Sequence, residues 1–272
     1  MKNLRWSWAG LVASLLVLVT ATSADAQRSS RYRGLSNDEN IGNERAPRRM
    51  IDNPTAGMLG RGSFDTELRA FPDGGMLGIL QIGLTKNWMV GIAYGGTNII
   101  AAHDPQWNPH MQFLTRLQLI GETMALPGLA VGYEDIGFGP WIDSLDRFDI
   151  KSKGFYAVVS KAYRGTSFTS SLHGGVNYSR ERADKDDDVD FFFGSDLRFD
   201  NNIGFVVEYD LGLNDDRKHH SLGKGEGYLN AGARWTVLER VLMEFNLKDI
   251  LTNRRGSNTI GRELRLIYVE SF

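Results

Sequence analysis

The chain closes with the stretch Gly-Arg-Glu-Leu-Arg-Leu-Ile-Tyr-Val-Glu-Ser-Phe, residues 261–272. In a β-strand, successive side chains point to opposite faces of the sheet. Glu263 and Arg265 point to one face of the strand. The other face is largely apolar and is interrupted by Glu270. Its apolar and aromatic side chains are Leu264, Leu266, Tyr268 and Phe272. The stretch therefore predicts a strand with one apolar face and one charged face.

A terminal strand of this kind, ending on an aromatic ring, resembles the C-terminal signal of bacterial outer-membrane β-barrels. The resemblance implies that the barrel-assembly machinery of the outer membrane binds the strand that ends at Phe272. It also implies an apolar outer surface in contact with outer-membrane lipid and lipopolysaccharide. We therefore expect the chain to lie in the bacterial outer membrane.

The start of the chain predicts export from the cytoplasm. Lys2 and Arg5 precede a short apolar run at residues 9–21, and Ala24-Asp25-Ala26 matches a small-x-small cleavage site. This is the pattern of a secretory signal peptide. The run is shorter than the roughly 20 residues that a membrane-spanning helix needs. We expect cleavage after Ala26, and an uncleaved anchor is the alternative.

Composition excludes several classes of protein. The chain has no cysteine, which excludes disulfides and thiol chemistry. Without residues 1–26, which hold Lys2, Arg5 and Asp25, the formal charge is 29 minus 32, or −3. A charge near zero gives no reason to expect nucleic acid as a partner. Neither a cofactor motif nor a metal-ligand spacing is present, so we expect no cofactor and no metal. The 31 glycines and 7 prolines favour strands and tight turns.

Residues 27–61 differ in character from the rest of the chain. They include Arg-Ser-Ser-Arg-Tyr-Arg-Gly (28–34) and Asn-Glu-Arg-Ala-Pro-Arg-Arg (43–49), which are polar, basic and without periodicity. Such a composition is typical of a flexible segment, which we expect to be a periplasmic leader. The alternative is a segment that folds back into the barrel, where its arginines would pair with acidic side chains.

From residue 62 onward, segments of strand length follow one another, and several alternate clearly between apolar and polar side chains. In residues 203–213, for example, Phe205, Val207 and Tyr209 oppose Glu208 and Asp210. Period-two segments of about ten residues are typical of transmembrane β-strands. The sequence predicts an all-β fold over residues 62–272, a single up-and-down antiparallel transmembrane barrel of about 12 strands. The predicted strands are 62–71, 75–85, 87–99, 109–122, 126–136, 153–163, 167–180, 189–200, 203–213, 226–237, 239–250 and 259–272.

The connections between these segments supply a second argument for a barrel. Short and long connections alternate, as expected for a barrel with turns on the periplasmic side and loops on the outer side. The short ones lie near Lys86, 123–125, 164–166, 201–202 and Leu238; the long ones are 100–108, 137–152, 181–188, 214–225 and 251–258. A tight turn at 72–74 is the exception. The alternative, a soluble β-sandwich, gives no reason for this alternation.

Charged side chains fall mainly on the face that would point into the barrel. Acids and bases are nearly balanced, so we expect ion pairs between neighbouring strands. The network is interpreted as structural, and a polar conduit is the alternative. Its predicted members are Glu67, Arg69, Arg116, Glu122, Glu134, Lys161, Asp196, Arg198, Glu208, Asp210, Arg234, Glu244, Lys248, Glu263 and Arg265.

Three further groups of polar residues are candidate sites. Five aspartates between residues 184 and 190 lie in a predicted outer loop without the spacing of a calcium loop, so we expect a solvated charge run. A divalent cation bridging lipopolysaccharide phosphates is the alternative. The pair His219-His220 is weak evidence for a metal. His173 shares its face with Ser171 and Asn177, and a twelve-stranded phospholipase with a Ser-His-Asn set is the enzymatic alternative.

Two stretches resemble a known family. Pro-Gly-Leu-Ala-Val-Gly-Tyr-Glu-Asp-Ile (127–136) and Gly-Phe-Tyr-Ala-Val-Val-Ser-Lys (154–161) are similar to outer-membrane proteins of the YjbH type. That resemblance implies a link to exopolysaccharide export. We expect a non-enzymatic barrel that serves transport or envelope export. The alternatives are a structural or adhesion barrel that acts through its outer loops and, third, a lipid-modifying enzyme.

Overall fold

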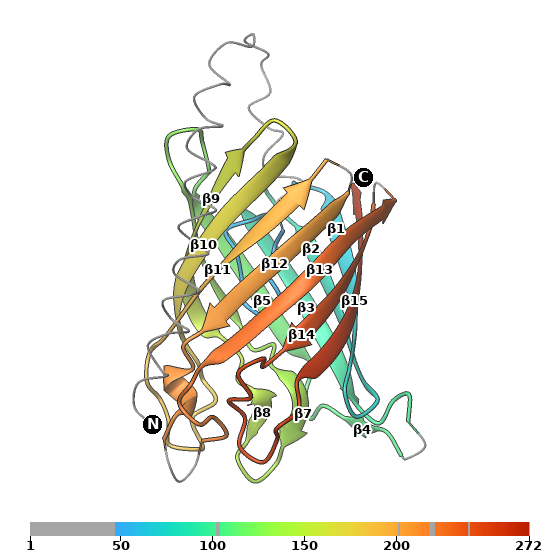
Figure 1. Ribbon diagram of the computed structural model, residues 1–272, viewed down its shortest axis with the longest axis vertical. Coiled ribbons are helices and arrows are strands. Elements are labelled where there is room, and N and C mark those ends of the chain that lie inside the picture. The colour runs from blue at the N-terminus through green and yellow to red at the C-terminus, as the bar shows by residue number, and fades with distance from the viewer. Residues whose placement is uncertain (1–46, 102–103, 201, 218–220, 239, 272) are drawn as a thin grey trace.

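The computed structural model describes residues 47–272 except 102–103, 201, 218–220, 239 and 272. The expected signal peptide, residues 27–46 of the expected leader, His219-His220 and Phe272 lie outside the described residues. Twelve antiparallel strands form one closed barrel (Figure 1). They are β1 (Ser63–Phe71), β2 (Gly75–Gly83), β3 (Trp88–Thr97), β5 (Gln112–Ile120), β6 (Gly128–Glu134), β9 (Gly154–Arg164), β10 (Phe168–Tyr178), β11 (Asp190–Phe199), β12 (Ile203–Asp210), β13 (Tyr228–Leu238), β14 (Val241–Lys248) and β15 (Gly261–Ser271).

Every barrel strand pairs with its neighbour along the chain, and the last strand returns to the first. β1 pairs with β2 on one side and with β15 on the other, where Leu68 lies opposite Leu266. Closure leaves the barrel without the row of unpaired backbone groups that an open sheet has at its edge. The predicted strands are thereby confirmed, each with its boundaries shifted by a few residues at most.

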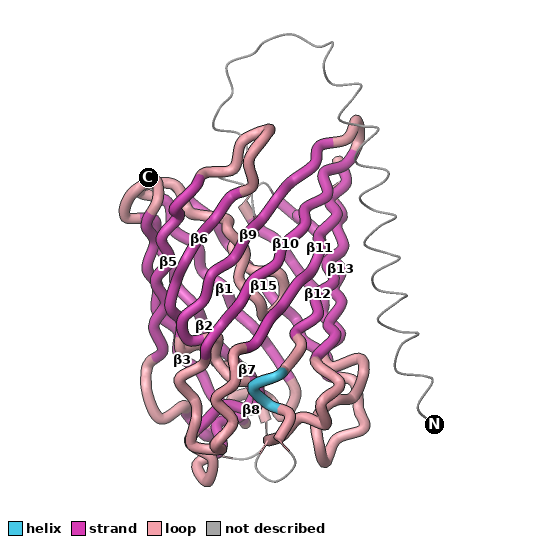
Figure 2. Tube along the Cα trace, turned by 90° about the vertical axis from the view of Figure 1, so that its left-hand side faces the viewer, coloured by secondary structure: helices cyan, strands magenta, loops and turns pink. Residues whose placement is uncertain are grey.

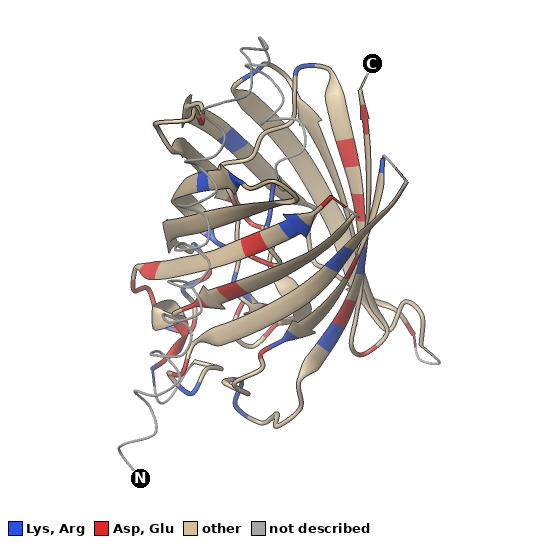
Figure 3. Cartoon of the chain, turned by 45° about the horizontal axis from the view of Figure 1, so that its top comes forward, with Lys and Arg blue, Asp and Glu red and all other residues tan. Residues whose placement is uncertain are grey.

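The alternation predicted from the sequence is present in the burial of the side chains. In β1, Glu67 and Arg69 point inward and are 3% and 0% exposed, whereas Leu68 between them is 42% exposed. The same arrangement, with polar side chains inside and apolar side chains outside, is found around the barrel. The outer surface carries a belt of exposed apolar side chains that includes Leu80, Ile92, Phe113, Phe155, Phe191, Phe205, Phe245, Leu264 and Leu266. Most charged side chains of the strands are buried on the inner face. Figure 3 marks where the charged residues lie along the strands.

The two ends of the barrel differ. One end, here called the turn end, has the short connections 84–87, 121–127, 165–167, 200–202 and 239–240, and Ser63 and Ser271 pair there. The other, the loop end, has the longer connections 98–111, 135–153, 179–189, 211–227 and 249–260, together with the tight turn 72–74. The loop end is at the bottom of Figure 1. The predicted alternation of short and long connections is therefore present.

The loops contain structure that the sequence did not predict. Residues 138–150, expected to be irregular, form the hairpin of β7 (Phe138–Ile142) and β8 (Arg147–Ile150). Two smaller elements are β4 (Gln106–Trp107) and the 3-10 helix η2 (Leu213–Asp215), drawn in cyan in Figure 2. The hairpin was missed because its strands are short and buried by contacts that only the folded barrel supplies. Phe138 lies in the interior, 4% exposed.

Residues 47–60 lie inside the barrel and Arg61 is exposed where the chain enters β1, in contrast to the periplasmic leader expected for residues 27–61. Arg49, Met50, Ile51, Asp52 and Asn53 are all at most 3% exposed. The described end of the chain is drawn in blue within the barrel in Figure 1. This arrangement corresponds to the alternative, a segment that folds back into the barrel. We call residues 47–61 the lumenal segment.

Candidate functional site

The candidate site is the contact between the lumenal segment and the barrel wall. The segment makes a tight loop, in which the backbone N–H of Met50 donates to the carbonyl of Asn53 (2.8 Å) and that of Thr55 to the carbonyl of Arg48 (3.2 Å). A bridge between Arg49 and Pro54 closes the loop. Within the described part of the chain, the backbone-to-backbone hydrogen bonds of residues 48–57 stay inside the segment. Side chains therefore attach it to the wall.

Arginines of the wall bind the carbonyl groups of the segment. Arg116 Nη1 donates to the carbonyls of residues 48 and 57, both at 2.8 Å. Arg69 Nη2 donates to the carbonyl of Ile51 (2.7 Å). The carbonyl of Met50 accepts from Arg234 Nη2 (2.5 Å) and Arg265 Nη1 (2.9 Å). Hydrogen bonds with a charged donor are stronger than those between neutral groups, so these four arginines hold the loop from several sides.

Acceptors of the wall bind the N–H groups of the segment. Both carboxylate oxygens of Glu208 are used, because the N–H groups of Ile51 and Asn53 donate to Oε2 (3.0 Å each) and that of Asp52 to Oε1 (2.9 Å). The N–H of Ala56 donates to Ser160 Oγ (2.8 Å). Buried backbone N–H groups need partners. The wall supplies them for residues 51–53 and 56.

Two charged side chains of the segment are paired with opposite walls. Arg49 forms a two-pronged ion pair with Glu134 on β6, with both N···O distances 2.7 Å. Asp52 lies 3.0 Å from Arg69 and 2.8 Å from Lys248 on β14. In the order of strands around the barrel, β6 and β14 are diametrically opposite. The segment thus bridges the full width of the lumen.

Apolar contacts complete the attachment. Met50, Ile51 and Ala56 pack in one buried cluster with wall residues that include Tyr156 and Phe192. Met58 and Leu59 pack in a second buried cluster with side chains of β2, β3 and β5, and with Ile136 and Phe138 from the loop end. The lumen is therefore filled from two directions, by the lumenal segment and by the β7–β8 hairpin.

The predicted polar network is brought together in part. Glu67 pairs with Arg69 (2.5 Å) and Arg265 (2.8 Å), and Glu244 pairs with Arg265 (2.9 Å) and Arg234. Ten of the predicted side chains are buried, namely Glu67, Arg69, Arg116, Glu134, Asp196, Glu208, Asp210, Glu244, Glu263 and Arg265. Arg198, Arg234 and Lys248 are partly buried, as are Glu122 and Lys161.

Some predicted members lie away from this centre. Lys161 lies 3.4 Å from Glu122 at the turn end, and Asp210 pairs with Lys153 near the loop end. Arg198 lines a cavity of about 520 Å³ at the turn end, which also contacts Arg48 and Asp196. The network is thus divided into a central part around the lumenal segment and separate pairs at the two ends.

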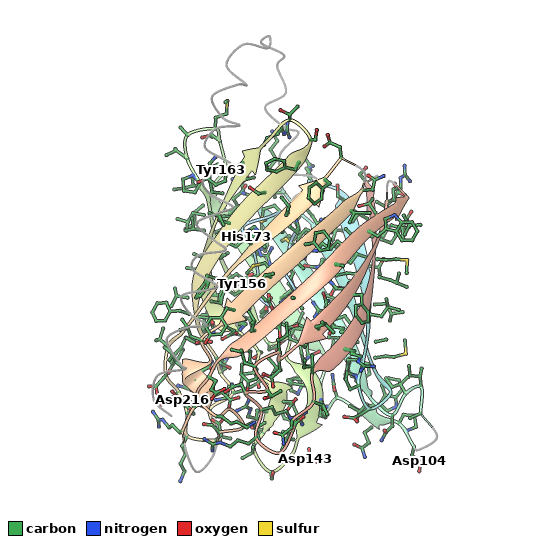
Figure 4. All side chains as sticks on the ribbon, viewed as in Figure 1. Asp104, Asp143, Tyr156, Tyr163, His173 and Asp216 are labelled. Atoms are coloured by element: carbon green, nitrogen blue, oxygen red, sulfur yellow. The ribbon has the colours of Figure 1, made fainter. Side chains whose placement is uncertain are left out.

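A line of hydrogen bonds runs across three neighbouring strands. Ser160 Oγ lies 2.8 Å from His173 Nδ1, and His173 Nε2 lies 2.8 Å from Asp196 Oδ2. All three side chains are buried, and His173 is labelled part-way along the wall in Figure 4. His173 shares its predicted inward face with Ser171 and Asn177, but its hydrogen-bond partners in the structure are Ser160 and Asp196. Because Ser160 and His173 are directly opposed on β9 and β10, the register sets this line.

At the loop end, buried ion pairs hold the loops together. Arg147 of β8 lies 2.7 Å from both Asp184 and Asp215. Burial by itself lowers the pKa of Arg147, but the two carboxylates outweigh it and raise the pKa. Lys151 also pairs with Asp184 (2.8 Å), and burial lowers the pKa of its ammonium group. We call the loops joined by these contacts, 135–153, 179–189 and 211–227, the loop cap.

The loop cap corrects the expectation for the aspartates of residues 184–190. Asp184, Asp186 and Asp190 are buried, at 1% exposure each, and so do not form a solvated charge run. Asp187 and Asp188 remain exposed near Arg217. Among the described residues, no group of three or more His, Asp or Glu side chains is arranged to hold a metal ion.

The side chains that the lumenal segment contributes were not among the predicted site residues. Arg49 and Asp52 stand in a stretch without periodicity, which gives no face or partner. The available signal was chemical, since a basic segment precedes a barrel with inward acids. Phe138 was missed because it stands in a loop expected to be irregular, and Lys153 because it stands at the very edge of a predicted strand.

Comparisons with known proteins give structural likenesses only. No family model and no curated protein sequence matches the chain. The structure is similar to the KdgM porin (TM-score 0.42, 7% identity, 77% of this chain and 99% of that chain) and the NanC porin (0.45, 7%, 77% and 99%). It is also similar to Omp33 of Acinetobacter baumannii (0.43, 9%, 77% and 97%). At these scores the likenesses carry no assignment of function, and the YjbH-type resemblance stays a prediction. No helix in the described ranges is long and apolar enough to cross a membrane.

Proposed function

We propose that this protein is a β-barrel of the bacterial outer membrane that forms a gated passage, closed by its own lumenal segment. The observation that carries the proposal is that a segment outside the barrel wall occupies a charged lumen and bridges its opposite walls, from Glu134 to Lys248. Wall side chains fill the interior of a barrel of about eight strands, and a twelve-stranded barrel is wider. Here the lumenal segment occupies the additional space, so its departure would open a passage.

The membrane location rests on the polarity of the wall. Exposed apolar side chains such as Leu68, Phe205 and Leu266 ring the outside, while charges face inward. In water this arrangement would leave a large apolar surface exposed, which soluble monomers avoid. In a bilayer, the closed sheet satisfies its backbone groups and the apolar belt contacts lipid. The loop end would then face lipopolysaccharide, and the strand ending at Phe272 would be the one bound by the assembly machinery.

The contacts of the segment suit reversible closure. The polar contacts of residues 48–57 with the wall are side-chain hydrogen bonds and ion pairs, all of which water can replace when the segment leaves. The wall behind the segment is charged, so an emptied lumen would be filled with water. Export of a polymer, which the YjbH-type resemblance implies, would be one use of that passage.

A disulfide that fixes the segment to the wall tests the proposal. A Cβ built on Gly128 lies 3.5 Å from Cβ of Ala56, which is within the range for a disulfide, and the chain has no other cysteine. In planar bilayers, the reduced Ala56→Cys/Gly128→Cys variant should open as the parent does, and oxidation should abolish opening. Gly128→Cys alone should not respond to oxidation. If the parent shows no conductance at any voltage, the barrel is structural or acts through its loops.

A hydrolytic activity is a second candidate, favoured by one observation. Ser160, His173 and Asp196 form the line of hydrogen bonds that a serine nucleophile, a base and an orienting carboxylate require. The lumenal segment covers Ser160, so substrate would reach it only after the segment moves. Release of fatty acid from phospholipid by the parent, lost in Ser160→Ala, would support this candidate. Absence of release by the parent would remove it.

A further inference from the structure

We propose that the lumen is a recognition site for a peptide turn with an arginine and, three residues later, an aspartate. In this view the lumenal segment is the intramolecular occupant of that site. The inference rests on the proposed function, since a peptide can enter only if the segment leaves.

The wall binds the peptide backbone itself. Glu208 accepts three consecutive N–H groups, from Ile51 to Asn53. Arg69, Arg116 and Arg265 donate to carbonyls of residues 48–57. Consecutive N–H donors alternating with carbonyl acceptors are present in every peptide, whatever its side chains. The wall is thus matched to a polypeptide as a class.

The wall also recognises two side chains of the segment by their charge. Glu134 binds the guanidinium of Arg49 with both oxygens, a geometry that favours arginine over lysine. The carboxylate of Asp52 lies between Arg69 and Lys248. By contrast, the buried amide of Asn53 has no hydrogen-bond partner among the described residues. The wall therefore selects for the charges at positions 49 and 52, and it does not select for the amide at 53.

Other classes of ligand fit the charges of the wall less well than a peptide does. A neutral glycan offers hydroxyl donors to Glu208, but it has no cation for Glu134 and no anion for Arg69 and Lys248. An acidic glycan supplies the anion and would leave Glu134 buried without its cation. Leaving a buried charge unpaired is costly, because the charge has lost its water. A peptide with both charges satisfies all these groups at once.

The test uses the full chain with its own segment weakened and its wall intact. In Arg49→Glu, residue 49 faces Glu134, and repulsion between the two carboxylates should release the segment. A fluorescent synthetic peptide of residues 47–61 is then added in detergent, and binding is followed by anisotropy. We expect the peptide to bind Arg49→Glu at least tenfold more tightly than it binds the parent, whose site is occupied.

Peptides that differ at a single residue distinguish specific recognition in the lumen from non-specific binding to the protein. A peptide with Asn53→Ala should bind as well as the unchanged peptide, because the amide makes no hydrogen bond in the site. A peptide with Arg49→Glu should bind at least tenfold more weakly. In the reciprocal chain Glu134→Arg, the preference should reverse, and the peptide with Arg49→Glu should bind better than the unchanged one. Retained heat-modifiable mobility on gels shows that each variant is folded.

Conductance distinguishes failure of this inference from failure of the proposed function. If Arg49→Glu conducts and the 47–61 peptide blocks it, both are supported. If Arg49→Glu conducts but neither binds nor is blocked by the peptide, peptide recognition is refuted and the gated passage stands. If a folded Arg49→Glu neither conducts nor binds peptide, both are refuted. Equal binding of malto-oligosaccharide and peptide would also overturn the selectivity for peptides.

Discussion

At the scale of single residues, the loop cap shows how burial can outweigh an ion pair. Asp149 is 6% exposed, and burial raises the pKa of its carboxyl group to about 6. Arg254 Nε lies 2.9 Å from Asp149 Oδ1, yet that oxygen receives no well-aligned hydrogen bond from the described residues. The nearby guanidinium therefore lowers the pKa by less than burial raises it.

The raised pKa of Asp149 predicts a loop cap that weakens as pH rises. The folded carboxyl holds its proton up to about pH 6, and the unfolded one only up to about pH 4. The contribution to stability is thus fully present below pH 4 and lost as pH rises through 6, by up to about 3 kcal/mol. Proteolysis of the loop cap should be faster at pH 8 than at pH 5 in the parent. In Asp149→Asn, this difference should become smaller; if it is unchanged, another group is responsible.

The line from Ser160 to Asp196 predicts a cost for removing its central ring. His173→Phe keeps the volume but removes the imidazole that binds the buried carboxylate of Asp196, whereas Ser160 Oγ keeps its hydrogen bond from the N–H of Ala56. A buried polar group without a partner costs about 1–3 kcal/mol, and more when it is charged. We expect the free energy of unfolding, measured with urea in lipid vesicles, to fall by at least this amount. The outward change Phe191→Leu on the adjacent strand is the control and should shift it by less.

For the residues of the site, the sequence predicted to which face of the sheet each side chain points, but not which partner it contacts. Alternation alone placed Glu134 and Glu208 on the inner face, and both are buried there. It gave no partner for either, because Glu134 pairs with Arg49, 85 residues away, and Glu208 binds backbone groups. Period-two patterns report which way a side chain points. They contain nothing about a non-periodic segment that later occupies the same space.

At the scale of elements, the β7–β8 hairpin joins the loop cap to the lumen through one aromatic ring. The guanidinium of Arg69 lies 4.3 Å from the centre of the Phe138 ring, and the ammonium of Lys248 lies 4.9 Å from it. Both cations also hold Asp52 of the lumenal segment. Cation–π contacts contribute about 0.5–2 kcal/mol each. The ring therefore links the hairpin to the group that fixes the segment.

Removal of this ring should loosen the hairpin and the segment together. Phe138→Ala deletes a buried side chain, at a cost of about 3–5 kcal/mol, and removes the contacts to Arg69 and Lys248. We expect faster proteolysis within residues 135–153 and more frequent channel opening. Phe113→Ala, which removes the same group from the outer face, should change neither. Faster proteolysis without a change in opening would show that the two elements are independent.

At the scale of the whole molecule, the architecture follows from two patterns that are readable in the sequence. The alternation of apolar and polar side chains indicated an apolar outer face and a charged inner face, the reverse of a soluble protein. The lengths of the connections distinguished the turn end from the loop end. Together they gave the number of strands and the closure of β1 against β15. Neither pattern extends to the lumen, whose contents come from a leader and a loop that carry no period. The filled interior is thus the part of the molecule that required three-dimensional contacts to be known.

The inverted polarity makes a prediction that separates a membrane barrel from a soluble one. Leu266 lies mid-strand on the outer face, opposite Leu68 and Met243. In a bilayer, Leu266→Arg should cost about 2–4 kcal/mol, because a charge at mid-depth meets hydrocarbon. The control is Leu126→Arg, in a connection at the turn end, which should cost less than about 1 kcal/mol because charges near the interface remain hydrated. Urea unfolding in phospholipid vesicles measures both. In a water-soluble barrel the two changes would be equally harmless, since both side chains are exposed.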